Sequence, residues 1–210
     1  RSNGRSRTEG SNGWRHMARV TSLCVFGGAS SRVEPAYLAA AARLGRIAAT
    51  RGVRIVNGGG RVGMMGAVSD AALAAGGQAV GVIPRHLMRR ELGHHGLTEL
   101  HVVDGMHSRK QKMFELSDAF AVLPGGVGTL DETFEIITWK QLGLHDKPIV
   151  LVNEAGYWDR LAGLIEGMVE VGFATAATAA LFALVAKVED VFPALDLAPD
   201  PALSADTARL

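Results

Sequence analysis

The sequence predicts one doubly wound α/β domain, in which helices flank a mainly parallel sheet. Short apolar runs alternate with helical patterns along most of the 210 residues, as in chains built from repeated βα units. Glycine-rich turns follow three of these runs and precede helical patterns. No long linker or internal repeat interrupts the alternation, and a chain with 48% hydrophobic residues can bury a sizeable core.

Each expected element follows from a local pattern. Strands are predicted where short, mostly apolar runs end in turn-forming residues. Pro35 at a first-turn position and Gly52 just past the end delimit the first helix. The expected strands cover residues 20–26, 53–56, 78–83, 98–103, 118–123, 148–152 and 181–185. The expected helices cover residues 35–51, the segment after the turn at 57–66, a short helix or lid at 84–91, and residues 106–117, 133–142, 157–171 and 187–195.

The net charge of +1 hides an uneven distribution. Residues 1–19 hold five arginines and one glutamate, which leaves 17 basic and 20 acidic groups in residues 20–210. Nucleic-acid binding requires a basic surface that can neutralise phosphates. A mildly acidic body therefore argues against a nucleic-acid partner.

Cysteine usage and hydropathy restrict the compartment. The single cysteine, Cys24, lies within an apolar run, so the chain has neither a disulfide framework nor a thiolate metal site. No apolar run reaches the roughly 18 residues of a membrane span, and residues 1–16 lack the apolar core of a signal peptide. We expect a cytoplasmic protein without a membrane partner.

The ends of the chain differ in composition from its body. Residues 1–16 are rich in Gly, Ser, Asn and Arg, and we expect a disordered extension there, with Met17 as a plausible native start. Residues 197–210 are expected to form a loose tail. The folded domain is expected to cover residues 17–196.

The most informative stretch is Pro-Gly-Gly-Val-Gly-Thr-Leu-Asp-Glu at residues 124–132, between a predicted strand and a predicted helix. Glycines let the backbone approach a ligand closely, and a helix N-terminus favours an anion such as phosphate. If Thr129 starts the helix, the Glu132 carboxylate lies about one turn further on. Thr129 and Glu132 also match a capping box, which would only stabilise the helix.

Two further glycine-rich turns follow strands. Residues 27–31 read Gly-Gly-Ala-Ser-Ser, and residues 57–66 contain a G-x-G-x-x-G match. A dinucleotide site would need a carboxylate about 20 residues after the match, at the end of the next strand, but the predicted strand 78–83 is followed by Pro-Arg-His and no carboxylate appears until Glu91. We therefore interpret the glycines of 57–66 as a close turn beside a shared site. In parallel sheets such turns meet beyond the carboxyl ends of the strands.

Charged residues near a helix start suggest a second contribution to this site. Arg109 and Lys110 come shortly after Met106, where the predicted helix begins. Cations near a helix N-terminus oppose the macrodipole, so their position indicates a functional use.

The histidines give no metal-binding pattern. They lack a helical HxxxH pair and have few acidic neighbours, so solvated or structural roles are favoured and no metal is expected. The residues concerned are His86, His94, His95 and His101.

Three motifs together resemble the LONELY GUY (LOG) family of cytokinin-activating phosphoribohydrolases. Residues 124–132 match the family's PGGxGTxxE, and Met106–Lys110 matches its arginine–lysine motif. Residues 58–66 resemble its GGGxxGLMG, with Met64 in place of leucine. The turn at 27–31 departs from the Gly-Ser version common in the family. The resemblance covers roughly residues 20–195 and implies a Rossmann-like nucleotide-binding catalytic domain.

The resemblance implies hydrolysis of the N-glycosidic bond of a nucleoside 5′-monophosphate, either AMP or N6-prenylated AMP. The free base, a cytokinin, and ribose 5-phosphate would be released without a metal or redox cofactor. It also implies a homodimer and a catalytic pair, Arg109 and Glu132. The implied substrate contacts are Glu91, Met106, Lys110, Gly125, Gly126, Val127, Gly128, Thr129 and Thr138. Thr138 has no independent support, because it lies about 240° around the helix from Glu132.

Two other functions remain open. Proteins of a similar fold carry the molybdenum cofactor, whose pterin phosphate would suit the same turns, and such a carrier would not need a hydrolytic carboxylate. A lysine decarboxylase label is often attached to similar sequences. That chemistry needs a lysine that forms a Schiff base with pyridoxal phosphate. A chain of 210 residues is also small for enzymes of that class.

Overall fold

The computed structural model describes residues 20–88 and 93–198. The expected extension at 1–16, most of the expected tail and Glu91 lie outside the described residues. In the described part, no helix is long and apolar enough to cross a membrane.

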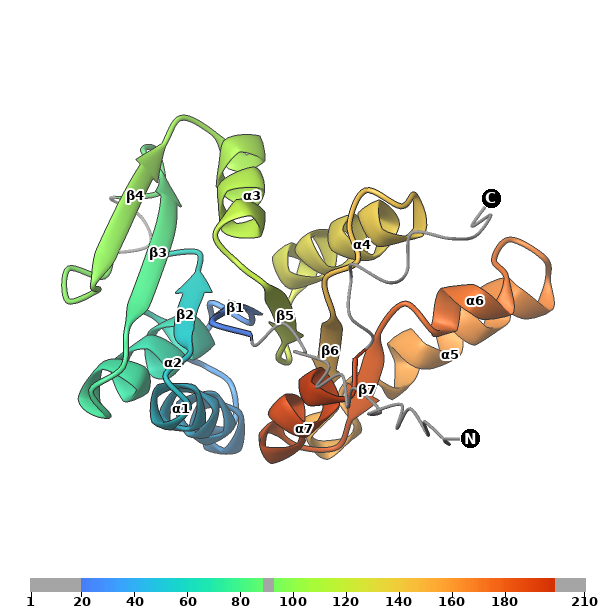
Figure 1. Ribbon diagram of the computed structural model, residues 1–210, viewed down its shortest axis with the longest axis horizontal. Helices are drawn as coiled ribbons and strands as arrows, with labels where there is room; N and C mark the ends of the chain where they lie inside the picture. The colour runs from blue at the N-terminus through green and yellow to red at the C-terminus, as the bar shows by residue number, and fades with distance from the viewer. Residues whose placement is uncertain (1–19, 89–92, 199–210) are drawn as a thin grey trace, which may run out of the picture.

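The described residues form one seven-stranded sheet, in the order β4-β3-β2-β1-β5-β6-β7 (Figure 1). Every neighbouring pair of strands is parallel, which confirms the expected doubly wound sheet. The strands are β1 (Ser22–Phe26), β2 (Arg54–Asn57), β3 (Ala79–Pro84), β4 (Glu99–Val103), β5 (Ala119–Val122), β6 (Ile149–Val152) and β7 (Ala183–Val185).

The helices follow the expected order with a few corrections. They are α1 (Pro35–Thr50), α2 (Gly63–Ala74), α3 (Met106–Glu115), α4 (Val127–Gln141), α5 (Asp159–Glu170), α6 (Ala176–Ala179) and α7 (Val191–Asp196), with short 3₁₀ segments η1 (Glu154–Gly156) and η2 (Val188–Asp190). Two predictions were wrong in detail, and one short helix was missed. Helix α4 begins six residues before the expected position, the closing helix is divided into η2 and α7, and α6 was not foreseen. Residues 85–88 form turns, and the rest of the expected lid lies outside the described part.

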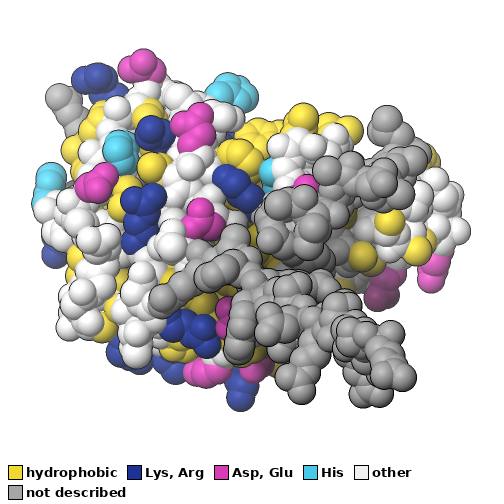
Figure 2. All heavy atoms as spheres, viewed as in Figure 1, with side chains coloured by type: hydrophobic (Ala, Val, Ile, Leu, Met, Phe, Trp, Pro, Cys, Tyr) yellow, Lys and Arg dark blue, Asp and Glu magenta, His cyan; other side chains and the backbone are white. Residues whose placement is uncertain are grey.

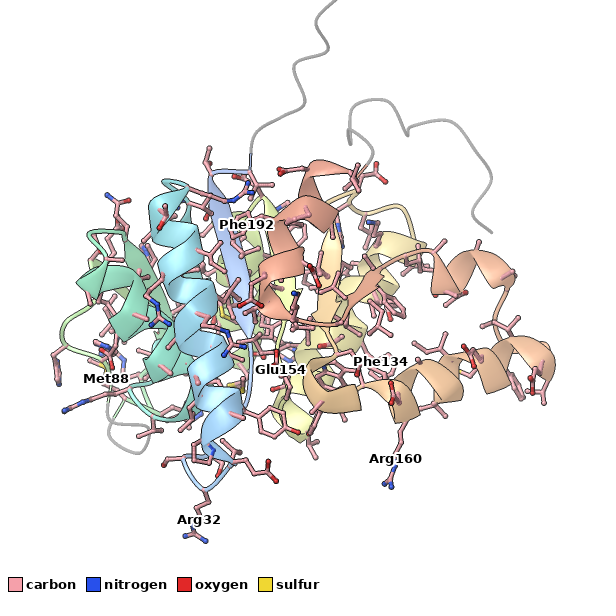
Figure 3. The ribbon with its side chains drawn as sticks, turned by 90° about the horizontal axis from the view of Figure 1, so that it is seen from below. Arg32, Met88, Phe134, Glu154, Arg160 and Phe192 are labelled. Carbon is pink, nitrogen blue, oxygen red and sulfur yellow. The ribbon has the colours of Figure 1, made fainter. Side chains whose placement is uncertain are left out.

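The helices cover both faces of the sheet. Along β1, Leu23 and Val25 pack with α1, α2 and α7, whereas Cys24 and Phe26 pack with α3, α4 and α5. This alternation follows from the two-residue period of a strand and gives two apolar cores. Phe192 of α7 and Phe134 of α4 belong to these opposite layers (Figure 3). Helices α5 and α6 extend past the β7 edge (Figure 1).

The order of the strands reveals where a ligand crevice can form. The chain runs from β1 outward to β4 and then returns to β5, which pairs with β1 on its other side. The loops after β1 and β5 therefore diverge to opposite faces, and such switch points are the usual binding sites of open α/β sheets.

Candidate functional site at the switch point

The three glycine-rich turns meet at the carboxyl edge of the sheet, as the sequence predicted. The Gly28 amide donates to Pro124 O at 3.0 Å, and the Met64 amide donates to Gly28 O at 2.8 Å. Gly63 has φ +65°, and a Cβ there would lie 2.5 Å from Gly28 O. The turns after β1, β2 and β5 thus form one continuous backbone surface.

The turn after β5 leads directly into α4. Gly126 is the N-cap, and its carbonyl accepts the first helical hydrogen bond from the Leu130 amide at 3.1 Å. Residues 126–128 are exposed. Amides of a first helical turn have no intrahelical acceptor, and the helix dipole adds partial positive charge. This exposed turn has the properties of a phosphate site.

The capping-box alternative is wrong. Thr129 lies inside α4 rather than at its N-cap, so Glu132 lies in the second turn. The Thr129 side chain is buried against Gly125, where a Cβ would lie 2.1 Å from Thr129 Oγ1. Thr129 therefore packs against the turn and does not cap the helix.

Tyr157, which sequence reasoning did not select, also contacts this turn. Its hydroxyl donates to Gly125 O at 2.6 Å, and its ring meets the Tyr37 ring edge-on at 5.9 Å. Tyr157 follows η1, where Ala155 has φ +54°, a left-handed conformation that is costly for a residue with a side chain.

Arg109 crosses from α3 to the carboxyl ends of β3 and β2. It is 5% exposed; its Nε donates to Val82 O at 3.1 Å and its Nη2 donates to Gly58 O at 2.9 Å. A Cβ on Gly58 would lie 1.9 Å from Nη2. The glycine motif and the arginine motif are therefore complementary, since Gly58 leaves the space that the guanidinium occupies.

Glu132 and Arg109 both act electrostatically on the buried Cys24 thiol. Burial raises the pKa of the Cys24 thiol far above its usual range; the Glu132 charge raises it further, and the Arg109 charge lowers it. Arg109 lies on α3 and Glu132 on α4, and these two helices pack on the Cys24 face of β1. Cys24 itself is fully buried, and a thiol with a raised pKa is no nucleophile.

Lys110 turns towards α4. Its Nζ lies 3.1 Å from Asp131 Oδ2 and 3.1 Å from Glu135 Oε1. Burial lowers the pKa of Lys110, but hydrogen bonds to Glu135 and Asp131 outweigh this effect and raise it. The ammonium is therefore charged and ties the start of α3 to α4.

The other predicted contacts lie in different places. Met106 is exposed at the start of α3, with Sδ 3.9 Å from Arg109 Nη1. Thr138 is exposed on α4, eleven residues after Val127 and thus about 16 Å along the helix axis. The structure brings Thr138 to neither the turn nor Arg109 within this chain.

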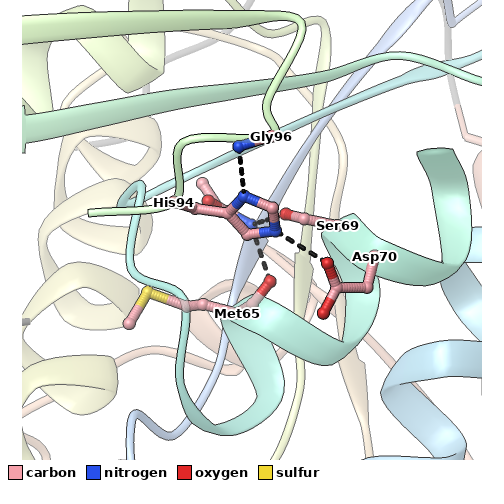
Figure 4. Close-up of polar contacts among 6 residues, drawn as sticks. Met65, Ser69, Asp70, His94 and Gly96 are labelled. Carbon is pink, nitrogen blue, oxygen red and sulfur yellow. Dashed lines mark hydrogen bonds and ion pairs between the residues drawn. The ribbon is translucent and has the colours of Figure 1, made fainter. Parts of the chain in front are cut away.

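The buried histidine of the expected loop is structural. His94 Nδ1 accepts from the Gly96 amide at 3.1 Å, and Nε2 lies 2.8 Å from Asp70 Oδ1 (Figure 4). Since the backbone amide can only donate, Nε2 carries the proton and donates to Asp70. His101 instead faces Glu99 at 3.3 Å. No group of three metal-ligating side chains occurs among the residues that the structure describes.

The face shown in Figure 2 mixes both charge signs. Lysine and arginine side chains alternate there with aspartate and glutamate, and no continuous basic stripe crosses the described atoms. This view gives no footprint of the kind that nucleic-acid backbones need.

Comparison with known sequences identifies the family. The family model described as "Possible lysine decarboxylase" matches residues 65–195. A cytokinin riboside 5′-monophosphate phosphoribohydrolase of Rhodococcoides fascians is 50% identical over 165 residues, covering 77% of this chain and 83% of that protein. The Arabidopsis thaliana enzyme LOG1, of the same name, is 42% identical over 178 residues, covering 81% and 84%.

Comparison with solved structures supports the fold. The molybdenum cofactor binding protein of Rippkaea orientalis superposes with a TM-score of 0.66 at 20% identity, over 85% of this chain and 97% of that one. The molybdenum cofactor carrier protein of Chlamydomonas reinhardtii gives 0.63 at 22% identity, over 85% and 97%. At these identities the likeness concerns the fold alone. The sequence relatives are much more similar, and the chain belongs to the LONELY GUY (LOG) family.

Proposed function

We propose that this protein hydrolyses the N-glycosidic bond of N6-prenylated adenosine 5′-monophosphate, releasing a cytokinin base and ribose 5-phosphate. AMP is the simpler substrate of the same class. The observation that carries the proposal is the buried Arg109 guanidinium, which Val82 O and Gly58 O hold at the edge of the sheet where the glycine-rich turns meet and the exposed turn begins α4. The relatives named above are enzymes of this activity.

Glu132 acts at the glycosidic bond that is broken. Cleavage of the C1′–N9 bond passes through an oxocarbenium-like state, which a neighbouring carboxylate stabilises. The same carboxylate accepts a proton from water as the water oxygen bonds to C1′. The base leaves with the electron pair of the broken bond and takes up the proton that Glu132 accepted from the water, so the carboxylate is regenerated. No metal or cofactor enters this step.

Arg109 serves as the oriented cation of the pair. Val82 O and Gly58 O fix the plane of its guanidinium, so little ordering is needed when substrate arrives. We assign it contacts with ribose or phosphate oxygens and the task of keeping Glu132 ionised. A planar fork suits this bidentate role better than the point charge of lysine.

The 5′-phosphate binds at the start of α4. Exposed amides of the turn hold it, and its binding energy orients the bond that reacts. Lys110 adds positive charge at the boundary of α3 and α4. We assign the substrate contacts to Gly125, Gly126, Val127, Gly128, Thr129, Lys110 and Met106. Glu91 and Thr138 are proposed as contacts on the family resemblance alone.

We further propose a homodimer in the cytoplasm. Leu142 and Leu144, at the end of α4, are 57% and 67% exposed, which suits burial against a second copy. Trp139, near the end of α4, is a poorer interface candidate, because its ring packs edge-on against Phe114 at 5.2 Å. The single free cysteine suits a reducing compartment.

The test is chromatography of products after incubation with AMP and with isopentenyladenosine 5′-monophosphate, using the unphosphorylated nucleosides as controls. Base should be released from the monophosphates alone. Glu132→Gln should abolish release while the protein stays folded. A folded wild type that binds nucleotide but releases no base would favour a carrier function, and a variant as fast as wild type would remove Glu132 from the mechanism.

The decarboxylase description fits the lysines poorly. A Schiff-base lysine needs a depressed pKa, whereas that of Lys110 is raised. Burial lowers the pKa of Lys147, but this residue lies two positions before the start of β6, at the sheet edge opposite the glycine turns. A pyridoxal absorbance band in the purified protein would revive that function.

A further inference from the structure

One peptide group links the catalytic arginine to a buried asparagine. The carbonyl of the Gly58–Gly59 peptide accepts from Arg109 Nη2 at 2.9 Å. The amide of the same peptide donates to Asn57 Oδ1 at 2.9 Å. In a trans peptide the C=O and N–H point in opposite directions. A rotation of this group that breaks one of the two hydrogen bonds therefore breaks the other.

This peptide needs an external clamp. It joins two glycines, and Gly59 has φ +73°, so the backbone on its own has access to many orientations. The Asn57 side chain bonds the amide two residues ahead, the geometry of an Asx turn. The polar anchor thus comes from the last residue of β2, which the sheet holds in place.

The Asn57 amide is itself fixed. It is 1% exposed, and its Nδ2 donates to Met65 O at 3.2 Å and to Ser69 Oγ at 2.8 Å. Met65 O can only accept and the Gly59 amide can only donate, so these two partners fix which end is Oδ1. Helix α2 therefore determines the orientation of the asparagine.

The far side of the turn is held as well. The His94 amide donates to Gly59 O at 3.0 Å, and the His94 ring is bound to Asp70 on α2 (Figure 4). Gly60 forms an antiparallel bridge with Gly93. These contacts hold the other side of the turn, while Asn57 Oδ1 accepts from the Gly59 amide of the peptide whose carbonyl binds Arg109.

We propose that Asn57 is a positioning residue, which orients Arg109 through the Gly58–Gly59 peptide. This inference rests on the proposed function, in which Arg109 contacts the substrate. The guanidinium donates to the backbone oxygens Gly58 O and Val82 O, and loss of the first removes one of the two hydrogen bonds that set its orientation against the sheet. A misoriented catalytic group lowers the turnover rate far more than it lowers substrate affinity.

The decisive comparison is Asn57→Ala with Asn57→Ser. Both remove the bonds to Met65 and Ser69 and leave a similar space, but the serine hydroxyl can still accept from the amide two residues ahead. With AMP we expect kcat of the alanine variant to fall about tenfold, the effect of one lost hydrogen bond, with KM little changed. The serine variant should stay within about threefold of wild type.

Two controls separate positioning from stability. Ser69→Ala removes a partner of the same asparagine without touching the Gly59 amide, and should lower the melting temperature while keeping kcat within about twofold. In an Arg109→Ala background, assayed at high enzyme concentration, Asn57→Ala should cause no further loss, since its effect passes through the arginine. Equal losses in both backgrounds, or a serine variant as slow as alanine, would overturn the proposal.

A spectroscopic readout distinguishes this proposal from the proposed function. The Nε–H proton of Arg109, buried against Val82 O, should give a slowly exchanging NMR signal, identified by its loss in Arg109→Ala. It should shift and broaden in Asn57→Ala and remain in Ser69→Ala. An unchanged signal in Asn57→Ala would refute the positioning role even if the enzyme is active. A wild type without hydrolysis would refute the function and leave this measurement valid.

Discussion

The two glycine-rich turns that frame the site look alike in sequence and differ in structure. The turn after β2 is buried, and protein groups occupy its polar surface, with Arg109 on one side and Asn57 on the other. The turn after β5 is exposed over residues 126–128 and opens at the N-terminus of α4. One turn is closed around a side chain, and the other is open to solvent.

The difference shows that glycine has two separate uses here. Gly58 provides space, because a Cβ there would overlap the guanidinium. At Gly126 and Gly128 a Cβ would meet no atom within 4 Å, so these glycines expose the backbone amides without being required for packing. A glycine motif by itself does not reveal which of these uses applies.

The largest expected effect comes from filling the closed turn. Gly58→Ala forces Arg109 out of its place, and we expect kcat/KM with AMP to fall more than about 100-fold, since the oriented cation is lost. Gly163→Ala is the matched control: it lies in α5 with no atom within 4 Å of its Cβ. That change should stabilise the helix by about 0.5–1 kcal/mol without affecting the rate. Wild-type activity in Gly58→Ala would show that the enzyme tolerates a side chain in the space that the Arg109 guanidinium occupies.

The open turn has one closed position, and a second prediction concerns it. A Cβ on Gly125 would lie 2.1 Å from Thr129 Oγ1 and 2.9 Å from Gly28 N. We expect Gly125→Ala to lower the stability by about 1–3 kcal/mol, which overpacking usually costs. Thermal unfolding measures this loss. Gly128→Ala, with no atom near its Cβ, should unfold near the wild-type temperature, and an equal loss in both variants would show that the turn is uniformly closed.

A smaller effect is expected from the hydroxyl that supports the open turn. Tyr157→Phe removes the hydrogen bond to Gly125 O and keeps the ring. We expect KM for AMP to rise about three- to tenfold with kcat little changed, because phosphate binding and not the chemistry depends on this turn. Tyr37→Phe keeps the same ring pair and should behave like wild type. A fall in kcat alone would place Tyr157 at the reacting bond.

The smallest effect concerns the far end of α4, away from both turns. Burial lowers the pKa of His145, whose Nε2 donates to Ile136 O at 2.8 Å. The unfolded chain therefore binds a proton more readily than the folded one, and stability from this group is lost as pH falls below about 6.5. Urea unfolding at pH 7.5 and 5.5 measures this effect. The free energy of unfolding should fall less between these pH values in His145→Gln than in wild type. If the free energy of unfolding of both proteins depends on pH in the same way, His145 does not contribute to the loss of stability in acid.

Much of the fold was predictable because local patterns and tertiary structure agree. Apolar runs correspond to the strands, and the motifs at 58–66, 106–110 and 124–132 identified Arg109 and Glu132 as candidates. The start of α4 was missed because two glycines seldom continue a helix and Thr129 resembles a cap. Contacts with Gly28 and Tyr157 hold that turn in place instead.

The supporting residues were not predictable from motifs. Asn57 before a glycine turn is a local Asx-turn signal, and it could have been noticed. Its connection to Arg109 spans 52 positions of sequence and exists only because β2, β3 and α3 meet at one edge. Tyr157 had no local signal, since its hydroxyl bonds a carbonyl 32 residues away.

The amino-acid sequence alone determined the α/β class, the order of the strands along the chain and the residue types available for chemistry, because these depend on local periodicity and composition. Tertiary structure decided which glycine turn closes around Arg109 and which stays open for a ligand. It also turned Lys110 towards Asp131 and Glu135. These outcomes depend on the contacts that distant segments make at the sheet edge, and nearest neighbours in sequence do not specify them.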